Sequence, residues 1–196
     1  MRFIILLLLS LSPLALAENA GAEIVFREIR DMPLETRFIV LHDILRSDTT
    51  AARKQSARAV VRVLLGGMEG IRKLLKLGEE HVLDPRDYIN ACAMKLAHLR
   101  LEKGIQFLND RLQDMTSHRE QIFFLQSHLS SQVEETSALP EAARELLLAK
   151  VGGEAKARLI LNLTPEEPLT NHQIVNLAHQ GLQCSDGARH LLEDDR

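Results

Sequence analysis

The chain has 196 residues, of which 26% are charged, with a net charge of −3, no tryptophan and one tyrosine. A mildly acidic chain with so few stacking aromatics is not typical of nucleic-acid-binding proteins, so we expect no nucleic-acid partner. The length allows one domain with a buried core, and the many Leu, Ala, Arg and Glu residues favour helices, because straight side chains lose little rotamer freedom there.

The first 17 residues have the pattern of a secretory signal peptide. Arg2 precedes an apolar run from Phe3 to Leu16, and Ala15-Leu16-Ala17 is a small-x-small cleavage site. The run is shorter than the ~20 residues that span a bilayer, and an uncleaved anchor is the alternative. We predict an exported chain without a transmembrane segment in its mature form. It would be periplasmic in a bacterium, which the composition of the signal favours, and secreted otherwise.

A loosely structured lead is expected over 18–33, followed by a single helical domain over 34–196. Apolar residues recur there with helical spacing, and no segment alternates with a period of two. The sequence thus predicts an all-α fold, either an irregular antiparallel helical bundle or a short α-solenoid, of about 8–10 helices. The main helices are expected over about 34–45, 50–65, 71–75, 85–99, 101–112, 118–129 and 140–151.

Several of these helices have recognisable start and stop signals. Gly66-Gly67 should end one helix, and Asp84-Pro85 should open another, with Asp84 as N-cap and Pro85 at the first helical position. Ser117 to Glu120 forms a capping box at the head of a later helix. The polar stretch 130–138 is expected to be a loop, after which Pro140 starts the next helix.

An internal similarity appears at an offset of 34 residues. It gives six identities over 18 ungapped positions, including Ala57 with Ala91 and Gly70 with Gly104. Each copy is expected to hold a helix, a tight turn and a second helix. Residues 50–115 in this respect resemble the helix–turn–helix units of tetratricopeptide or HEAT-like repeat proteins, which would imply a protein-binding solenoid. Helix pairs of an ordinary antiparallel domain would give the same pattern.

Positive charge is concentrated between Thr49 and Leu77, which carries seven basic residues and one acid. Three of the basic residues are spaced by four and should form one stripe on a helix. Such a surface would suit an acidic protein or an anionic envelope component, and the alternative is the solvated back of an amphipathic helix. The candidate partner-binding residues of this basic stripe are Lys54, Arg58, Arg62, Arg72, Lys73 and Lys76.

The two cysteines, Cys92 and Cys184, are candidates for a disulfide, because an exported protein enters an oxidising compartment. The alternative is two buried thiols, since Cys92 lies among small apolar residues. Non-reducing mass spectrometry of the intact protein distinguishes these two states.

No recognisable catalytic or metal-binding pattern is present in the sequence. The eight histidines include no pair three or four residues apart, and the HExxH, CxxC and Gly-x-Ser-x-Gly motifs are missing. We therefore predict no catalytic residue, no metal site and no cofactor, although an enzyme without a recognisable motif remains an alternative.

Residues 169–173 read Leu-Thr-Asn-His-Gln, and Thr170 with Gln173 forms a capping box. Leu169 and Ile174 are placed to pack together as a hydrophobic staple. This stretch resembles the LTxxQ motif of the Spy/CpxP family of periplasmic helical chaperones. Residues 163–167, Leu-Thr-Pro-Glu-Glu, resemble a second copy with Glu167 in the place of the glutamine. The resemblance implies a small exported chaperone or stress-sensing protein.

Export, paired helices and segregated charge together predict a soluble, non-enzymatic protein-binding or adaptor protein. Its partner is expected to be another protein. The chaperone and the enzyme without a recognisable motif are the alternatives.

Overall fold

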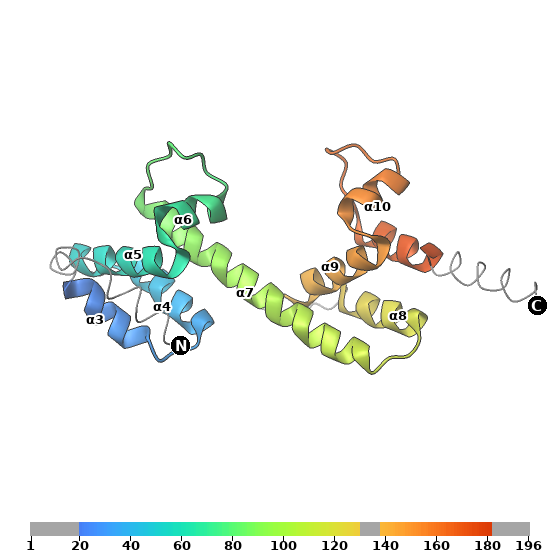
Figure 1. Cartoon of the computed structure of the whole chain (residues 1–196), viewed down its shortest axis with the longest axis horizontal. Helices are drawn as coiled ribbons and strands as arrows, with labels where there is room; N and C mark the ends of the chain where they lie inside the picture. Colours follow the sequence, from blue (N-terminus) through green and yellow to red (C-terminus); the bar gives the residue numbers. More distant parts are fainter. Residues whose placement is uncertain (1–19, 130–137, 182–196) are drawn as a thin grey trace, which may run out of the picture. The chain divides into compact units, whose positions relative to one another are not determined.

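A computed structural model describes residues 20–129 and 138–181 (Figure 1). Over these ranges it contains nine helices and no strand, which confirms the all-α prediction. Within the same ranges no helix has both the length and the apolar character needed to cross a membrane. The predicted signal peptide, 1–17, lies outside the described residues.

The chain divides into two compact units, Met1–His98 and Leu99–Arg196. The sequence predicted a single domain over 34–196 instead. The boundary lies inside helix α7 (Pro85–Gln113). The first half of α7 buries Tyr88 and Cys92 in the N-terminal unit, whereas its second half buries Leu108 and Leu112 in the C-terminal unit. Each unit is described by itself below.

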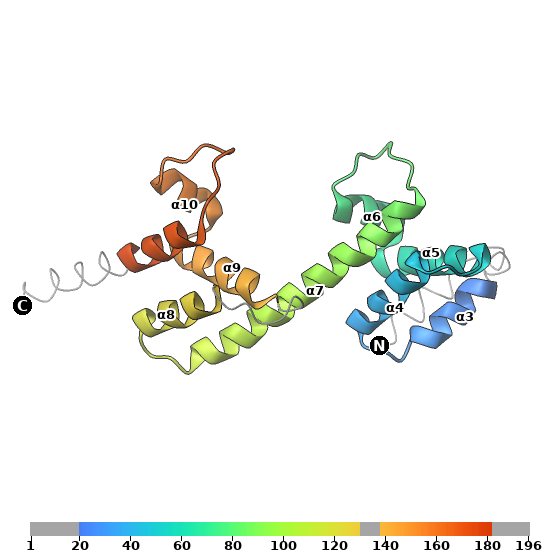
Figure 2. The ribbon, with the colours of Figure 1, turned by 180° about the vertical axis from the view of Figure 1, so that it is seen from behind.

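The described part of the N-terminal unit starts with three neighbouring helices, α3 (Ala20–Ile29), α4 (Leu34–Arg46) and α5 (Ala51–Leu65), which lie side by side in Figure 2. The prediction of a loose lead over 18–33 is wrong for most of its length, because α3 occupies it. The cause is a short apolar stripe: Val25 and Ile29 are four residues apart, so both fall on one helix face and are buried.

The helix ends predicted near Thr50, at Gly66 and at Asp84 are confirmed. Thr50 caps α5, with its Oγ1 accepting the Arg53 N–H at 3.2 Å. Gly66 ends α5 with φ of 81°, a left-handed conformation that glycine adopts without strain. Helix α6 (Gly67–Leu75) follows at once. Asp84 then caps α7, its Oδ1 accepting the N–H of Asp87 at 3.1 Å.

Helix α7 replaces the two helices predicted over 85–99 and 101–112. The sequence pattern suggested a break because the apolar stripe changes phase between Leu99 and Leu101. The shift coincides with the boundary between the two units. The helix therefore continues without a turn, and its buried residues pack in the N-terminal unit before the boundary and in the C-terminal unit after it. The tight turn expected in the second copy of the 34-residue repeat is consequently absent from α7.

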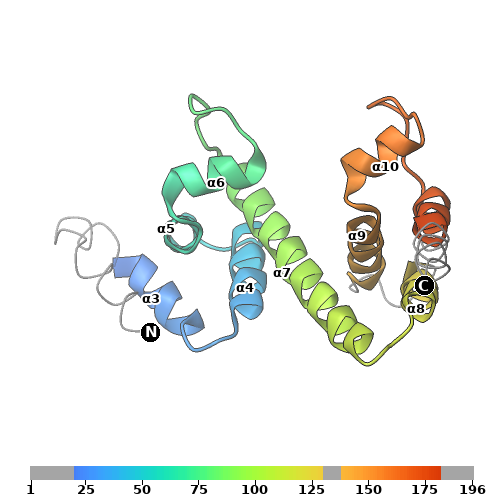
Figure 3. The same cartoon turned by 45° about the vertical axis from the view of Figure 1, so that its right-hand side comes forward.

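The C-terminal unit contains the end of α7 together with α8 (His118–Leu129), α9 (Leu139–Val151), α10 (Glu154–Ile160) and a last helix over 171–181 (Figure 3). Helix α9 packs against both α8 and α10. The α7 backbone approaches α9 closely at Gly104, where an added Cβ would lie 3.0 Å from the Ala142 Cβ. The buried core of this unit includes Leu125, Leu147 and Ile174.

Candidate functional site

The residues of the predicted basic stripe lie on two helices of the N-terminal unit. Lys54, Arg58 and Arg62 are on α5; Arg72 and Lys73 are on α6, and Lys76 follows at its C-cap. Lys73 and Lys76 are exposed, whereas Lys54, Arg58 and Arg72 are partly buried. The six residues therefore differ in how far they are open to a partner.

Two of these arginines form hydrogen bonds within the N-terminal unit. The Arg62 Nε donates a hydrogen bond to the buried Tyr88 hydroxyl at 2.6 Å, and its guanidinium lies 5.3 Å from the centre of that ring. The Arg72 Nε donates to the His81 carbonyl at 3.0 Å. These contacts tie α5 and α6 to the start of α7 and the preceding loop, so both side chains have a structural role.

Cys92 is completely buried on α7, and Cys184 lies outside the described residues. The predicted disulfide between them therefore stays a prediction. Burial raises the pKa of the Cys92 thiol to about 12, from an ordinary value of 9.0. A neutral thiol in this position behaves as a small apolar side chain.

The raised pKa of Cys92 predicts a loss of stability at alkaline pH. Because the unfolded thiol ionises above about pH 9 and the folded one does not, the free energy of unfolding should fall between about pH 9 and 12. At pH 10 the loss from this group is about 1.4 kcal/mol. Urea unfolding at pH 8 and pH 10 measures it, with Cys92→Ala as the matched control and Cys184→Ser in both proteins. An equal pH dependence of the two proteins would contradict the expectation.

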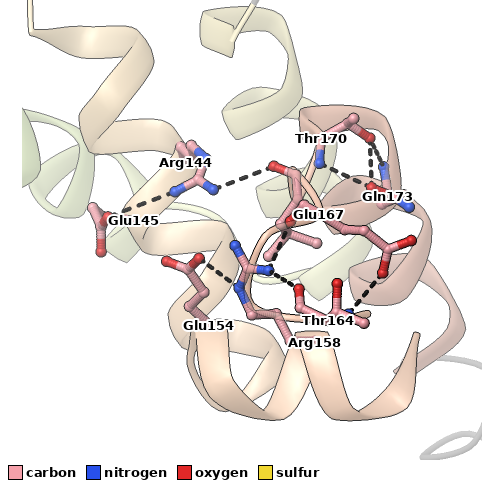
Figure 4. A network of polar contacts seen from close by, with 9 residues as sticks. Arg144, Glu145, Glu154, Arg158, Thr164, Glu167, Thr170 and Gln173 are labelled. Atoms are coloured by element: carbon pink, nitrogen blue, oxygen red, sulfur yellow. Dashed lines mark hydrogen bonds and ion pairs between the residues drawn. The ribbon is translucent and has the colours of Figure 1, made fainter. Parts of the chain in front are cut away.

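The two Leu-Thr stretches of the C-terminal unit close in the same way (Figure 4). In the first Leu-Thr turn (163–167) the Thr164 N–H donates to Glu167 Oε2 at 2.7 Å. In the second Leu-Thr turn (169–173) the Thr170 N–H donates to Gln173 Oε1 at 2.9 Å. A side-chain oxygen three residues on thus accepts from the threonine amide in each, and glutamate and glutamine serve equally because both carry that oxygen.

The second Leu-Thr turn is also a complete capping box, as predicted. The Gln173 N–H donates back to Thr170 Oγ1 at 3.3 Å, so the bond is reciprocal. Leu169 and Ile174 are both buried in the core of the unit, where the proposed staple requires them. The turn therefore starts the last helix and fixes its apolar face.

The two turns should respond differently to loss of the threonine side chain. Thr170→Ala removes the Oγ1 that accepts the Gln173 amide, and we expect a loss of about 1 kcal/mol of unfolding free energy. Thr164→Ala is the matched control, because the hydrogen bonds of the first turn use the backbone N–H and carbonyl of Thr164, and it should cost less than about 0.5 kcal/mol. Chemical denaturation of both variants measures the difference. Equal losses of unfolding free energy in the two variants would show that the capping box of the second turn adds no stability beyond that of the first turn.

Arg158, on α10, holds the first Leu-Thr turn in place (Figure 4). Its Nη1 donates to the carbonyls of Thr164 and Glu167 at 3.0 and 2.8 Å, while its Nε pairs with Glu154 at 3.0 Å. One planar guanidinium thus joins the helix to two backbone carbonyls of the turn. The second turn has a longer contact of the same kind, from Arg144 Nη2 to the Leu169 carbonyl at 3.4 Å.

Two aliphatic side chains are exposed directly after Arg158. Leu159 is 80% exposed and Ile160 is 54% exposed, and we call them the α10 apolar pair. The adjoining Ala157 is fully buried, and Leu161 packs against the core. The inward face of this short segment is thus already occupied, which leaves the α10 apolar pair facing solvent.

The histidines of the last helix contact neighbouring side chains. His172 Nε2 accepts from the Asn176 side-chain amide at 3.0 Å, and the His179 ring centre lies 5.2 Å from that of Phe123 on α8. Among the described residues no three His, Cys, Asp or Glu side chains form a group suited to a metal ion. His179 therefore contributes to helix packing through an aromatic contact.

No pattern in the sequence indicated a functional role for Arg158 or for the α10 apolar pair. The spacing of Glu154 and Arg158 by four residues would have indicated their ion pair. The hydrogen bonds from Arg158 to the turn depend on a chain reversal after α10, in which Asn162 adopts a positive φ of 52°. The exposure of Leu159 depends on which neighbours face the core, and that is a property of the packed unit.

Comparison of the chain with protein-family models, with curated proteins and with solved structures gave no match.

Proposed function

We propose that this chain is an exported, non-enzymatic protein-binding module, periplasmic if its source is bacterial. The observation that carries this proposal is the α10 apolar pair beside a turn that Arg158 holds to its helix. Exposed aliphatic side chains gain free energy when a partner covers them. A surface already held in position loses little conformational entropy on binding, which favours association.

The exposed basic residues support a second contact region in the N-terminal unit. Lys73 and Lys76 lie at the end of α6, where their charges are open to solvent. An acidic protein surface or an anionic envelope component would complement them, and such a contact weakens as salt rises. Replacing both lysines by glutamate should therefore abolish the salt-sensitive contact made by this region.

Site-specific photo-crosslinking in cells tests the proposal. A photoreactive phenylalanine analogue placed at position 159 of the full chain should give a reproducible adduct with a defined exported protein. The matched control is position 82, because Val82 is 83% exposed in the N-terminal unit. Position 82 should not give that adduct. Failure to obtain any protein adduct from position 159, from the basic residues or in a pull-down with the intact chain would refute the function.

A second candidate is the small exported chaperone. It is favoured by the common closure of the two Leu-Thr turns, which both place a side-chain oxygen on the threonine amide. The mature chain at equimolar concentration should then delay the aggregation of a chemically unfolded client, as measured by light scattering. An unchanged aggregation rate would dispose of this candidate.

A further inference from the structure

The α10 apolar pair has a size and setting that restrict its partner. The pair exposes on the order of 200 Å² of apolar surface. A stable protein–protein interface usually needs roughly 800 Å² from each partner, with a larger apolar centre. A two-fold contact between copies through this pair alone would thus be far too small for a stable dimer. The area instead suits a short segment of two or three apolar side chains.

The charge around the pair points to the flanking residues of such a segment. Glu166 and Glu167 are exposed on the first Leu-Thr turn, which Arg158 binds to α10 beside the pair. The charge of Arg158 itself is matched by Glu154 at 3.0 Å. Lys156 extends over Gly152, at the opposite end of α10. Two exposed carboxylates thus lie on the turn that Arg158 attaches to α10, and they favour a basic residue on the partner.

We propose that the α10 apolar pair binds a short segment of another exported protein in which two aliphatic residues are flanked by lysine or arginine. This rests on the proposed function and adds the surface and the chemical class of the partner. The aliphatic side chains cover Leu159 and Ile160, and the basic residue faces Glu166 and Glu167. Binding combines apolar burial with a salt-sensitive charge contact.

Fluorescence anisotropy with a labelled decapeptide tests this inference. The probe carries two adjacent leucines between two lysines, and a second peptide has glutamates in the place of the lysines. The double variant Leu159→Ser, Ile160→Ser should bind the lysine peptide at least about tenfold more weakly than the unaltered chain. Val82→Ser is the matched control and should bind unchanged. The glutamate peptide should bind the unaltered chain more weakly, and 0.5 M salt should remove most of that difference.

Folding is checked separately, because a misfolded variant would also lose binding. Both side chains are exposed, so the serine variant should keep the thermal midpoint of the unaltered chain. Leu159→Met preserves the apolar surface and should keep the affinity.

Three outcomes would overturn the inference. The first is that the serine variant and the Val82→Ser control bind the lysine peptide equally well. The second is that the unaltered chain does not bind the lysine peptide. The third is that the unaltered chain sediments as a dimer and the serine variant as a monomer. If position 159 fails in these assays but the intact chain still captures a defined partner, this surface is wrong and the proposed function stands. If the intact chain captures nothing, the proposed function fails as well.

Discussion

Replacing Arg158 by methionine is expected to lower the unfolding free energy of the C-terminal unit by about 2–4 kcal/mol. The variant keeps much of the apolar stem but loses the hydrogen bonds to the carbonyls of Thr164 and Glu167 and the ion pair with Glu154. The two hydrogen bonds share the single donor nitrogen Nη1 and together contribute about 1.5–3 kcal/mol, and the ion pair adds less than about 1 kcal/mol. The first Leu-Thr turn should loosen before the rest of the unit.

Hydrogen exchange followed by mass spectrometry measures this local effect, since the amides of 163–167 should exchange faster while those of α9 stay protected. Arg119→Met is the matched control, because Arg119 is an exposed arginine of the same unit whose guanidinium lies 5.7 Å from the Phe123 ring centre. It should cost about 0.5–1 kcal/mol. Unchanged exchange at 163–167 in Arg158→Met would contradict the role given to this side chain.

Gly104→Leu is expected to destabilise the C-terminal unit by about 1–2 kcal/mol. An added Cβ at this position would lie 3.0 Å from the Ala142 Cβ and 3.3 Å from the Ala138 carbonyl oxygen. A larger side chain must therefore push α7 and α9 apart, and overpacking of this kind costs about 1–3 kcal/mol. The gain of about 1 kcal/mol from removing a glycine from a helix interior offsets part of a larger loss.

The matched control is Ala97→Leu, an exposed position on the same helix, which should change stability by less than about 0.5 kcal/mol. Chemical denaturation gives both free energies, and hydrogen exchange assigns the loss to a unit. Equal stability of the Gly104→Leu variant and the unaltered chain would show that α7 and α9 do not approach each other at this point.

These two predictions depend on contacts that sequence patterns did not indicate. The sequence did predict the helices themselves and many of their ends, such as Thr50, Gly66 and Asp84, because caps and left-handed turns depend on residues only a few positions apart. The capping box of Thr170 and Gln173 was predictable for the same reason. It remains the part of the candidate site that the sequence identified correctly.

Two predictions from the sequence were wrong because the features depend on tertiary packing. The sequence pattern indicated a loose lead over 18–33, although Val25 and Ile29 suffice to hold α3 once α5 is there to cover them. It also predicted two helices in place of α7. A shift in the spacing of apolar residues looks the same in the sequence whether the chain turns or one continuous helix changes its packing partner. The basic stripe was found as a charge pattern, but only the fold assigns Arg62 to Tyr88 and leaves Lys73 exposed.

By itself, then, the sequence determined the all-α class, several helix starts and stops and the two Leu-Thr motifs, since all of these follow from local backbone chemistry and periodicity. The tertiary structure decided the division into two units, the close approach of α9 at Gly104, the attachment of the first Leu-Thr turn by Arg158 and the exposure of Leu159 and Ile160. Burial is a property of an assembled core. The identity of an apolar residue does not by itself determine whether neighbouring side chains bury it in the folded protein.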